Sequence, residues 1–96
     1  LIDACQSAGH LRLNVKKNMC DALLCSGRKY LRGPRGTGLI FIKDCIQKKI
    51  IPKIIDTTKS KIIGRNLSII NSTNIFETFE YSPSLKIGLS KAIEKI

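Results

Sequence analysis

A short glycine-rich, basic segment constrains this chain most, because it lies between two apolar runs. Residues 26–38 read Ser-Gly-Arg-Lys-Tyr-Leu-Arg-Gly-Pro-Arg-Gly-Thr-Gly and hold four of the seven glycines. The apolar runs are residues 22–25 and residues 39–42. This pattern is typical of two buried strands joined by a loop. Such a loop can offer backbone N–H groups and cations to an anion. The sequence therefore predicts an anion-binding loop, in which Lys29 serves either as a charge or as a nucleophile.

The length and the two ends of the chain suggest a piece of a longer protein. Ninety-six residues form at most one small domain. The sequence starts with Leu-Ile-Asp rather than Met, and it ends within an apolar stretch of helical spacing. We therefore expect an internal fragment, with a small processed domain as the alternative.

The charge balance does not by itself identify a partner. The net charge is +10, which is typical of nucleic-acid-binding proteins. However, the basic residues are spread along the chain, and the aromatic residues at 76, 79 and 81 lie among acidic ones. A nucleic-acid-binding module would cluster its charge and interleave aromatic residues for base stacking. We expect no nucleic-acid partner. The alternative from another functional class is a basic module that binds nucleic acid.

The cysteines and the hydropathy favour a cytoplasmic protein without a metal. None of the four cysteines forms a C-x-x-C pair, so we expect no zinc site. They are Cys5, Cys20, Cys25 and Cys45. The sequence shows no signal peptide and no apolar run of about 18 residues, which favours a reducing cytoplasm and no membrane partner.

The first half of the chain reads as strands and turns. Residues 1–5 resemble the end of a buried strand, which places Asp3 near the carboxyl edge where open α/β sheets bind ligands. Residues 8–10 form a turn, and the single histidine, His10, is expected to be structural or solvated. Asn14 is suited to cap a short helical turn. Residues 21–25 predict a second strand, a parallel neighbour of the first.

The second half is less regular until its last segment. Residues 38–43 predict a third strand, and Asp44 is expected to cap a helix over residues 45–50. Residues 61–70 predict a weak strand or an irregular excursion, and residues 71–74 a polar loop. Ser82 and Pro83 are a good N-cap and first position of a final helix. Its predicted apolar stripe is Leu85, Leu89, Ala92, Ile93 and Ile96.

Two chemistries suit the central segment. The first is phosphate binding, in which the Ser26 hydroxyl and backbone N–H groups at the end of the strand would donate hydrogen bonds to a phosphate. In the second, Lys29 forms a Schiff base, which neighbouring cations favour because they stabilise the neutral amine. A pyridoxal cofactor also needs an acid partner for its ring nitrogen, and Asp3 is placed to supply one. Gln6 could then bond the phenolic oxygen of the ring.

Three separated motifs resemble the class V aminotransferase and cysteine desulfurase-like family. They are residues 1–11 (Leu-Ile-Asp-Ala-Cys-Gln-Ser-Ala-Gly-His-Leu), Cys20-Asp21 and residues 26–38. A weaker resemblance continues through Phe-Glu-Thr-Phe-Glu at 76–80, which is similar to a branch with epimerase-like and carbon–sulfur lyase-like members. The resemblance implies an α/β fold of the fold type I, aspartate aminotransferase-like enzymes. It further implies that residues 1–50 belong to a large cofactor-binding domain and residues 51–96 lead toward a small one.

The resemblance also implies residue roles and partners. Lys29 would form the internal aldimine with pyridoxal 5'-phosphate and later move the α-proton of an amino-acid substrate. Asp3 would pair with the ring nitrogen, Gln6 would lie near the phenolic oxygen, and Ser26 would contact the phosphate. Arg28 would lie beside the cofactor, where many desulfurases have histidine. Full-length members would be homodimers.

The resemblance leaves the reaction type open. Transamination, epimerisation and carbon–sulfur cleavage are each compatible with these residues. The arginine at 28 disfavours a cysteine desulfurase proper, and none of the four cysteines matches the sulfur-accepting position of those enzymes. The desulfurase reaction stays an alternative, as does an inactive remnant of the same fold. We expect the 96-residue piece alone to be inactive.

Overall fold

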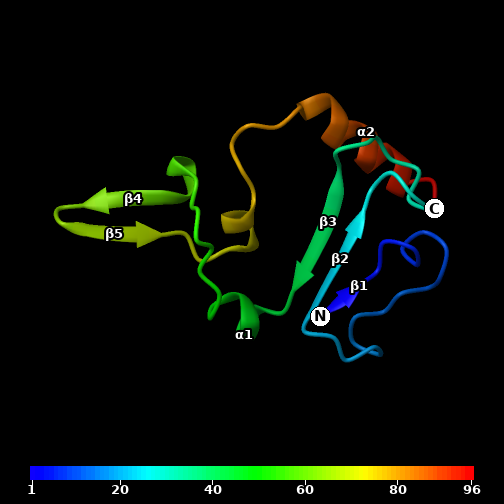
Figure 1. The fold of residues 1–96 in the computed structure, drawn as a ribbon, viewed down its shortest axis with the longest axis horizontal. Helices are drawn as coiled ribbons and strands as arrows, with labels where there is room; N and C mark the ends of the chain where they lie inside the picture. Colours follow the sequence, from blue (N-terminus) through cyan, green and yellow to red (C-terminus); the bar gives the residue numbers. More distant parts are fainter. The chain divides into compact units, whose positions relative to one another are not determined.

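The computed structural model describes residues 1–96 and contains five strands, two α-helices and two 3-10 helices (Figure 1). The contacts within the chain group into two units. The first comprises residues 1–42 and 82–96, and the second comprises residues 43–81. The predicted division at residue 50 concerns the domains of longer enzymes and stays a prediction.

The first unit contains a three-stranded sheet in the order β1-β2-β3. Strand β1 (Ile2–Asp3) is parallel to β2 (Ala22–Ser26), and Asp3 lies opposite Leu24. Strand β3 (Gly38–Ile42) is antiparallel to β2, and Gly38 lies opposite Ser26. The three predicted strands and the parallel pairing of the first two are confirmed. Asp3 ends β1 as predicted, and the glycine-rich segment connects β2 to β3.

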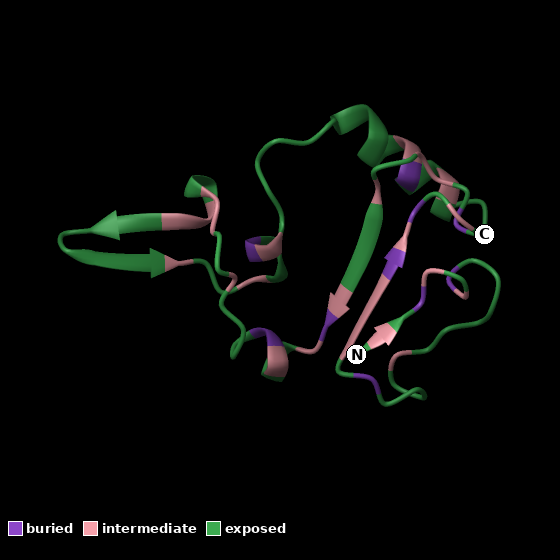
Figure 2. Ribbon diagram, in the orientation of Figure 1, coloured by how far each residue is buried: buried purple, intermediate pink, exposed green.

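The core of this unit is small and lies beside β2. Ala4, Ala8, Cys25 and Leu31 form a buried cluster, against which Ile2 and Leu23 pack. Figure 2 shows that β3 is exposed along most of its length. The prediction of buried strands is therefore wrong for β3, and it is only partly correct for β2, where Cys25 alone is buried and the other residues are half-buried. In β1, Ile2 is half-buried and Asp3 is exposed. Because β3 is the edge strand, Leu39 and Ile40 each keep nearly half of their surface exposed and only Ile42 is buried.

The connection from β1 to β2 is a series of turns. Gly9 adopts φ +85°, and His10 N–H donates to Ser7 O, so the predicted turn at residues 8–10 is confirmed. The Asn14 carboxamide oxygen accepts the N–H groups of Lys16 and Lys17, each at 3.0 Å. The predicted cap of a short helical turn is thus also confirmed.

Helix α2 (Pro83–Ile93) completes the first unit. The helix starts where Ser82 and Pro83 predicted it, although the Ser82 side chain caps no backbone N–H. The predicted apolar stripe is only partly correct. Leu89 is buried and Ala92 is half-buried, whereas Leu85, Ile93 and Ile96 are exposed. The reason is that α2 contacts its unit through a narrow surface around Leu89, and Ile96 lies beyond the end of the helix.

The second unit begins with the short helix α1 (Asp44–Gln47). Asp44 is its first residue, whereas the N-cap position belongs to Lys43, so the predicted capping role of Asp44 is wrong. The helix also ends at Gln47 rather than near Ile50. The next turns tighten instead, since Ile50 N–H bonds Gln47 O three residues back.

A hairpin and two 3-10 helices form the rest of the second unit. After η1 (Thr57–Lys59), strands β4 (Ser60–Ile63) and β5 (Asn66–Ile69) pair antiparallel. The prediction of one weak strand or an irregular excursion is wrong, because Gly64 at φ +63° allows a tight two-residue turn there. The predicted polar loop at 71–74 in part becomes η2 (Thr73–Phe76), whose N-cap Ser72 accepts the Asn74 N–H. None of the helices combines the length and the apolar character of a membrane span.

Candidate functional site

Asp3 lies where the positive charge of Lys29 acts on its carboxylate. Asp3 lies exposed at the end of β1, and its carboxylate oxygen Oδ1 accepts the Cys5 N–H at 2.9 Å. Hydrogen bonds from the Cys5 side chain and backbone lower the pKa of Asp3, and the positive charge of Lys29 lowers it further. Asp3 is therefore an ionised carboxylate at neutral pH, within the field of the lysine.

Backbone hydrogen bonds anchor the loop that carries Lys29. Gly27 N–H donates to Thr37 O, and Gly33 N–H donates to Gly27 O, each at 2.8 Å. These two bonds tie the entry of the loop to its exit. Inside them, Arg32 N–H donates to Lys29 O at 2.8 Å, with Arg32 in the left-handed region at φ +57°. Lys29 is thus held on a closed turn and is half-buried.

Helix α2 packs directly on this loop. A Cβ added at Gly33 would lie 2.6 Å from Cδ1 of Leu89, so a larger residue there would force the Leu89 side chain to shift. On the helix side, a Cβ added at Gly88 would lie 2.8 Å from Cγ of Pro34. Gly27 and Gly33 of the loop therefore allow close packing against Leu89, and Gly88 allows close packing of α2 against Pro34.

The other predicted site residues lie on the same two segments. Ser26 is the last residue of β2 and is half-buried. Gln6 is exposed in the turn that follows β1, and Arg28 is exposed beside Lys29. Their proposed roles toward a cofactor stay predictions, because the structure establishes their position and not their ligand.

Cys5 is a residue that our reasoning from the sequence missed. It contributes the hydrogen bonds that hold and ionise Asp3. A signal for the backbone bond was present, since an aspartate at a strand end readily accepts the N–H of the second residue after it. The four cysteines are free, with Cys20 and Cys25 buried and Cys45 exposed. Burial raises the pKa of the Cys25 thiol, so Cys25 is an uncharged member of the core.

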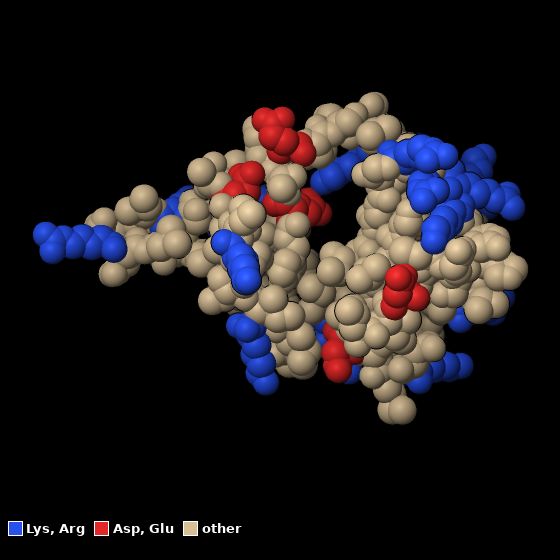
Figure 3. All heavy atoms as spheres, viewed as in Figure 1, with Lys and Arg blue, Asp and Glu red and all other residues tan.

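Basic side chains surround the lysine loop. Figure 3 shows Lys and Arg gathered over the surface that α2 and the loop between β2 and β3 form. From the loop, Arg28, Arg32 and Arg35 are all exposed. Such a surface attracts anions in general, and anion binding by residues 26–38 stays a prediction.

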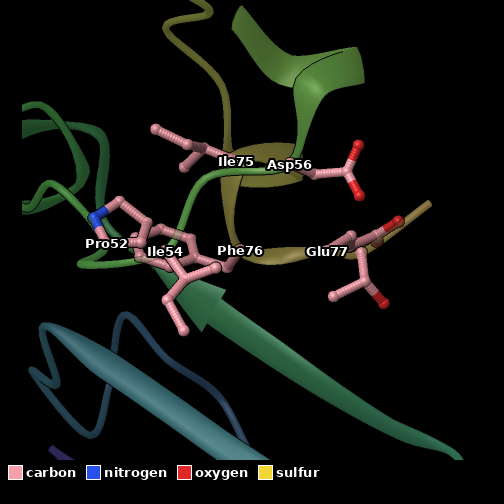
Figure 4. Close-up of a pocket in the computed structure, with 7 residues that line it drawn as sticks. Pro52, Ile54, Asp56, Ile75, Phe76 and Glu77 are labelled. Carbon is pink, nitrogen blue, oxygen red and sulfur yellow. The ribbon is translucent and has the colours of Figure 1, made fainter. Parts of the chain in front are cut away.

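The second unit has a small pocket of its own (Figure 4). Its floor is largely apolar, and acidic side chains lie at one end. The lining residues are Pro52, Ile54, Asp56, Ile75, Phe76, Glu77 and Thr78. Both oxygens of Asp56 are engaged, because Oδ1 accepts from Thr58 and Oδ2 accepts the Phe79 N–H. Asp56 therefore ties the chain around residue 79 to the start of η1.

Comparison with known proteins identifies the family. The family described as aminotransferase class-V matches residues 1–93. The chain is 35% identical over 100 residues to a probable cysteine desulfurase of Borreliella burgdorferi, which covers 99% of this chain and 24% of that protein. It spans about a quarter of the length of such relatives.

Solved structures agree with this result. The apo structure of a cysteine desulfurase from Thermococcus onnurineus NA1 matches 97% of this chain and 24% of its own, with a TM-score of 0.85 at 31% identity. The cysteine desulfurase CsdA from Escherichia coli shares the fold, with a TM-score of 0.85 at 23% identity over 99% of this chain and 24% of its own. The expected α/β fold of the fold type I enzymes is confirmed. The chain belongs to the class V aminotransferase family.

Proposed function

We propose that this chain forms part of the active site of a pyridoxal-phosphate-dependent enzyme that acts on an amino acid. The observation that carries the proposal is the placement of ionised Asp3 in the field of Lys29, in a chain that matches the family over residues 1–93. The donor set suits the cofactor. An amine fits its carbonyl carbon, a carboxylate fits its protonated ring nitrogen, and a hydroxyl among arginines fits its phosphate.

Four residues would hold the cofactor, and a fifth would lie beside it. Lys29 would bind it covalently, and Asp3 would pair with its ring nitrogen. Gln6 would lie near the phenolic oxygen, Ser26 would contact the phosphate, and Arg28 would lie beside the cofactor. When bound, the cofactor would supply an electron sink for the bonds at the α-carbon of the substrate.

The residues of this chain would then position and transfer a proton. The Lys29 amine would act as the general base that takes the α-proton of the substrate. The carboxylate of Asp3 would keep the proton on the ring nitrogen, because a lowered pKa keeps that carboxylate negative at neutral pH. The anchored turn around Lys29 supports this role, since proton transfer requires the amine at a defined position.

The covalent role is tested by borohydride reduction of the full-length enzyme, followed by peptide mass spectrometry. We expect the pyridoxyl mass on the peptide that contains Lys29 and its loss in Lys29→Ala. Lys91→Ala is the matched control, because Lys91 is 70% exposed in α2, where it pairs with Glu94 at 2.8 Å. Covalent cofactor retained by Lys29→Ala would refute the assignment.

The role of Asp3 is tested with Asp3→Asn. The variant keeps the size of the side chain and loses its charge, so cofactor binding should weaken by about tenfold or more, the equivalent of one charged hydrogen bond. Exchange of the α-hydrogen of the substrate with deuterium from solvent should slow as well. Unchanged exchange and unchanged binding would contradict the pairing with the ring nitrogen.

Cysteine desulfurase chemistry is the second candidate, because the relatives carry that name. Arginine at position 28, where many desulfurases have histidine, supports aminotransferase, epimerase-like or carbon–sulfur lyase-like chemistry instead. Incubation with cysteine separates these. Alanine as the product would support a desulfurase, and pyruvate a lyase. Amino transfer would require an added 2-oxo acid.

The assembly and location are part of the same proposal. We infer a cytoplasmic homodimer, with residues 1–50 in the large domain and residues 51–96 leading toward the small one. The support is the similarity to relatives about four times as long as this chain. The 96 residues alone should be inactive. Sedimentation of the full-length enzyme tests the dimer, and an active 96-residue piece would contradict the last expectation.

A further inference from the structure

The single histidine contacts the residue that follows Lys29. The rings of His10 and Tyr30 are stacked, with their centroids 4.7 Å apart and an angle of 26° between their planes. This geometry lies within the range that favourable aromatic pairs adopt. The two residues are far apart in the sequence, so the stack joins the turn after β1 to the lysine loop.

Two further contacts connect the same segments. The backbone of Gly9 lies against that of Tyr30, since a Cβ added at Gly9 would be 2.5 Å from Tyr30 O. Ala8 and Leu31 are both buried in the core cluster of the unit. Residues 8–10 are therefore fixed to residues 30 and 31, immediately beyond Lys29.

The turn that holds Tyr30 begins at the other candidate site residue. Asp3 ends β1, and the next residue, Ala4, is fully buried and accepts the N–H of Ala8 at 2.9 Å. His10 N–H then donates to Ser7 O at 3.0 Å. One hydrogen-bonded segment, residues 3–10, thus carries Asp3 at one end and the ring stacked on Tyr30 at the other.

We propose that His10 and Tyr30 are positioning residues, whose stacked rings fix the lysine loop relative to Asp3 so that the Lys29 amine meets the cofactor held by that carboxylate. The proposal rests on the proposed function of Lys29. It assigns no contact between either ring and the reacting atoms. The stack acts through the backbone of Tyr30, which is directly bonded to Lys29.

The test compares variants that remove the stack with variants that keep it. In the full-length enzyme, His10→Ala and Tyr30→Ala should raise the dissociation constant for pyridoxal phosphate about two- to twelvefold, the range equivalent to one aromatic pair. The fraction of cofactor that borohydride fixes on Lys29 should fall at subsaturating cofactor. His10→Phe and Tyr30→Phe retain a stacking ring, so their dissociation constants for pyridoxal phosphate should stay within about twofold of the wild-type value. A twofold change is smaller than the loss expected from removing even the weakest aromatic pair.

A second variant separates positioning from stability. Ile75 is buried in the second unit, so Ile75→Ala should lower stability and leave the dissociation constant unchanged. The proposal would be overturned if His10→Ala bound pyridoxal phosphate as tightly as the wild type. It would also be overturned if His10→Phe bound the cofactor as weakly as His10→Ala. Either of these two outcomes would still be compatible with borohydride fixing the cofactor on Lys29, so neither would contradict the proposed function. In contrast, a wild-type enzyme without cofactor fixed on Lys29 would overturn the proposed function itself.

Discussion

Gly9→Ala is the substitution that most directly tests how the lysine loop is held. Gly9 has φ +85°, a conformation in which an L side chain is strained. The added methyl group would also lie 2.5 Å from Tyr30 O, 2.6 Å from Tyr30 C and 2.8 Å from Leu31 N. All three are backbone atoms, so the clash cannot be relieved by rotating a side chain.

The expected cost has two main contributions. Placing alanine in the left-handed region costs about 1–2 kcal/mol. Forcing a methyl group into a packed contact adds about 1–3 kcal/mol. The reduced entropy of the unfolded chain offsets about 0.4–1 kcal/mol of this. We therefore expect Gly9→Ala to lower the free energy of unfolding by roughly 1–4.6 kcal/mol.

Gly64→Ala is the matched control. Gly64 also has a positive φ, +63°, yet an added Cβ there has no atom within 4 Å. Gly64→Ala has the same cost of placing alanine at a positive φ and the same entropy effect on the unfolded chain as Gly9→Ala. The difference in the free energy of unfolding between the two variants therefore isolates the contact with Tyr30. Urea denaturation of the full-length protein, followed by circular dichroism, should show Gly9→Ala as less stable than Gly64→Ala by about 1–3 kcal/mol. Equal losses would refute the steric argument.

Further predictions concern the packing of α2 and the response to acid. Leu89 is 6% exposed, so Leu89→Ala should cost about 2–5 kcal/mol in urea denaturation. Leu67 is 59% exposed on β5, so Leu67→Ala should cost no more than about 0.5 kcal/mol, and similar losses would contradict the packing described. Hydrogen bonds from Phe79 and Thr58 lower the pKa of Asp56. Its stabilising contribution is therefore complete above the unfolded value of about 3.9 and is lost as the pH falls through the folded value. Asp56→Asn should flatten the loss of stability below about pH 4, and an unchanged acid profile would argue against those bonds.

Structural features that depend on a few adjacent residues could be predicted from the sequence. Asp3 at a strand end, the turn at Gly9 and the start of α2 at Pro83 are all where the sequence pattern indicated. The motif around Lys29 indicated which residues to consider for a site, and their roles toward a cofactor stay predictions. Local conformational preferences and short motifs carry this information, because each depends on a few adjacent residues.

Local patterns were least reliable in the second unit. Residues 60–69 form a hairpin although residues 60–63 do not alternate apolar and polar side chains, and the turn at Gly64 is the only clear signal. Asp44 looked like a cap but begins the helix itself. Boundaries of this kind depend on backbone geometry that a single residue type does not define.

The sequence by itself determined the strands of the first unit, the loop between them and the residue types able to hold a cofactor. Only the tertiary structure decided what surrounds them. It packed Leu89 against two glycines of the loop, stacked His10 on Tyr30, and made Cys5 the partner of Asp3. The physical reason is that strands and turns follow from short-range sterics, whereas burial and side-chain pairing depend on which distant segments the fold brings within a few ångströms.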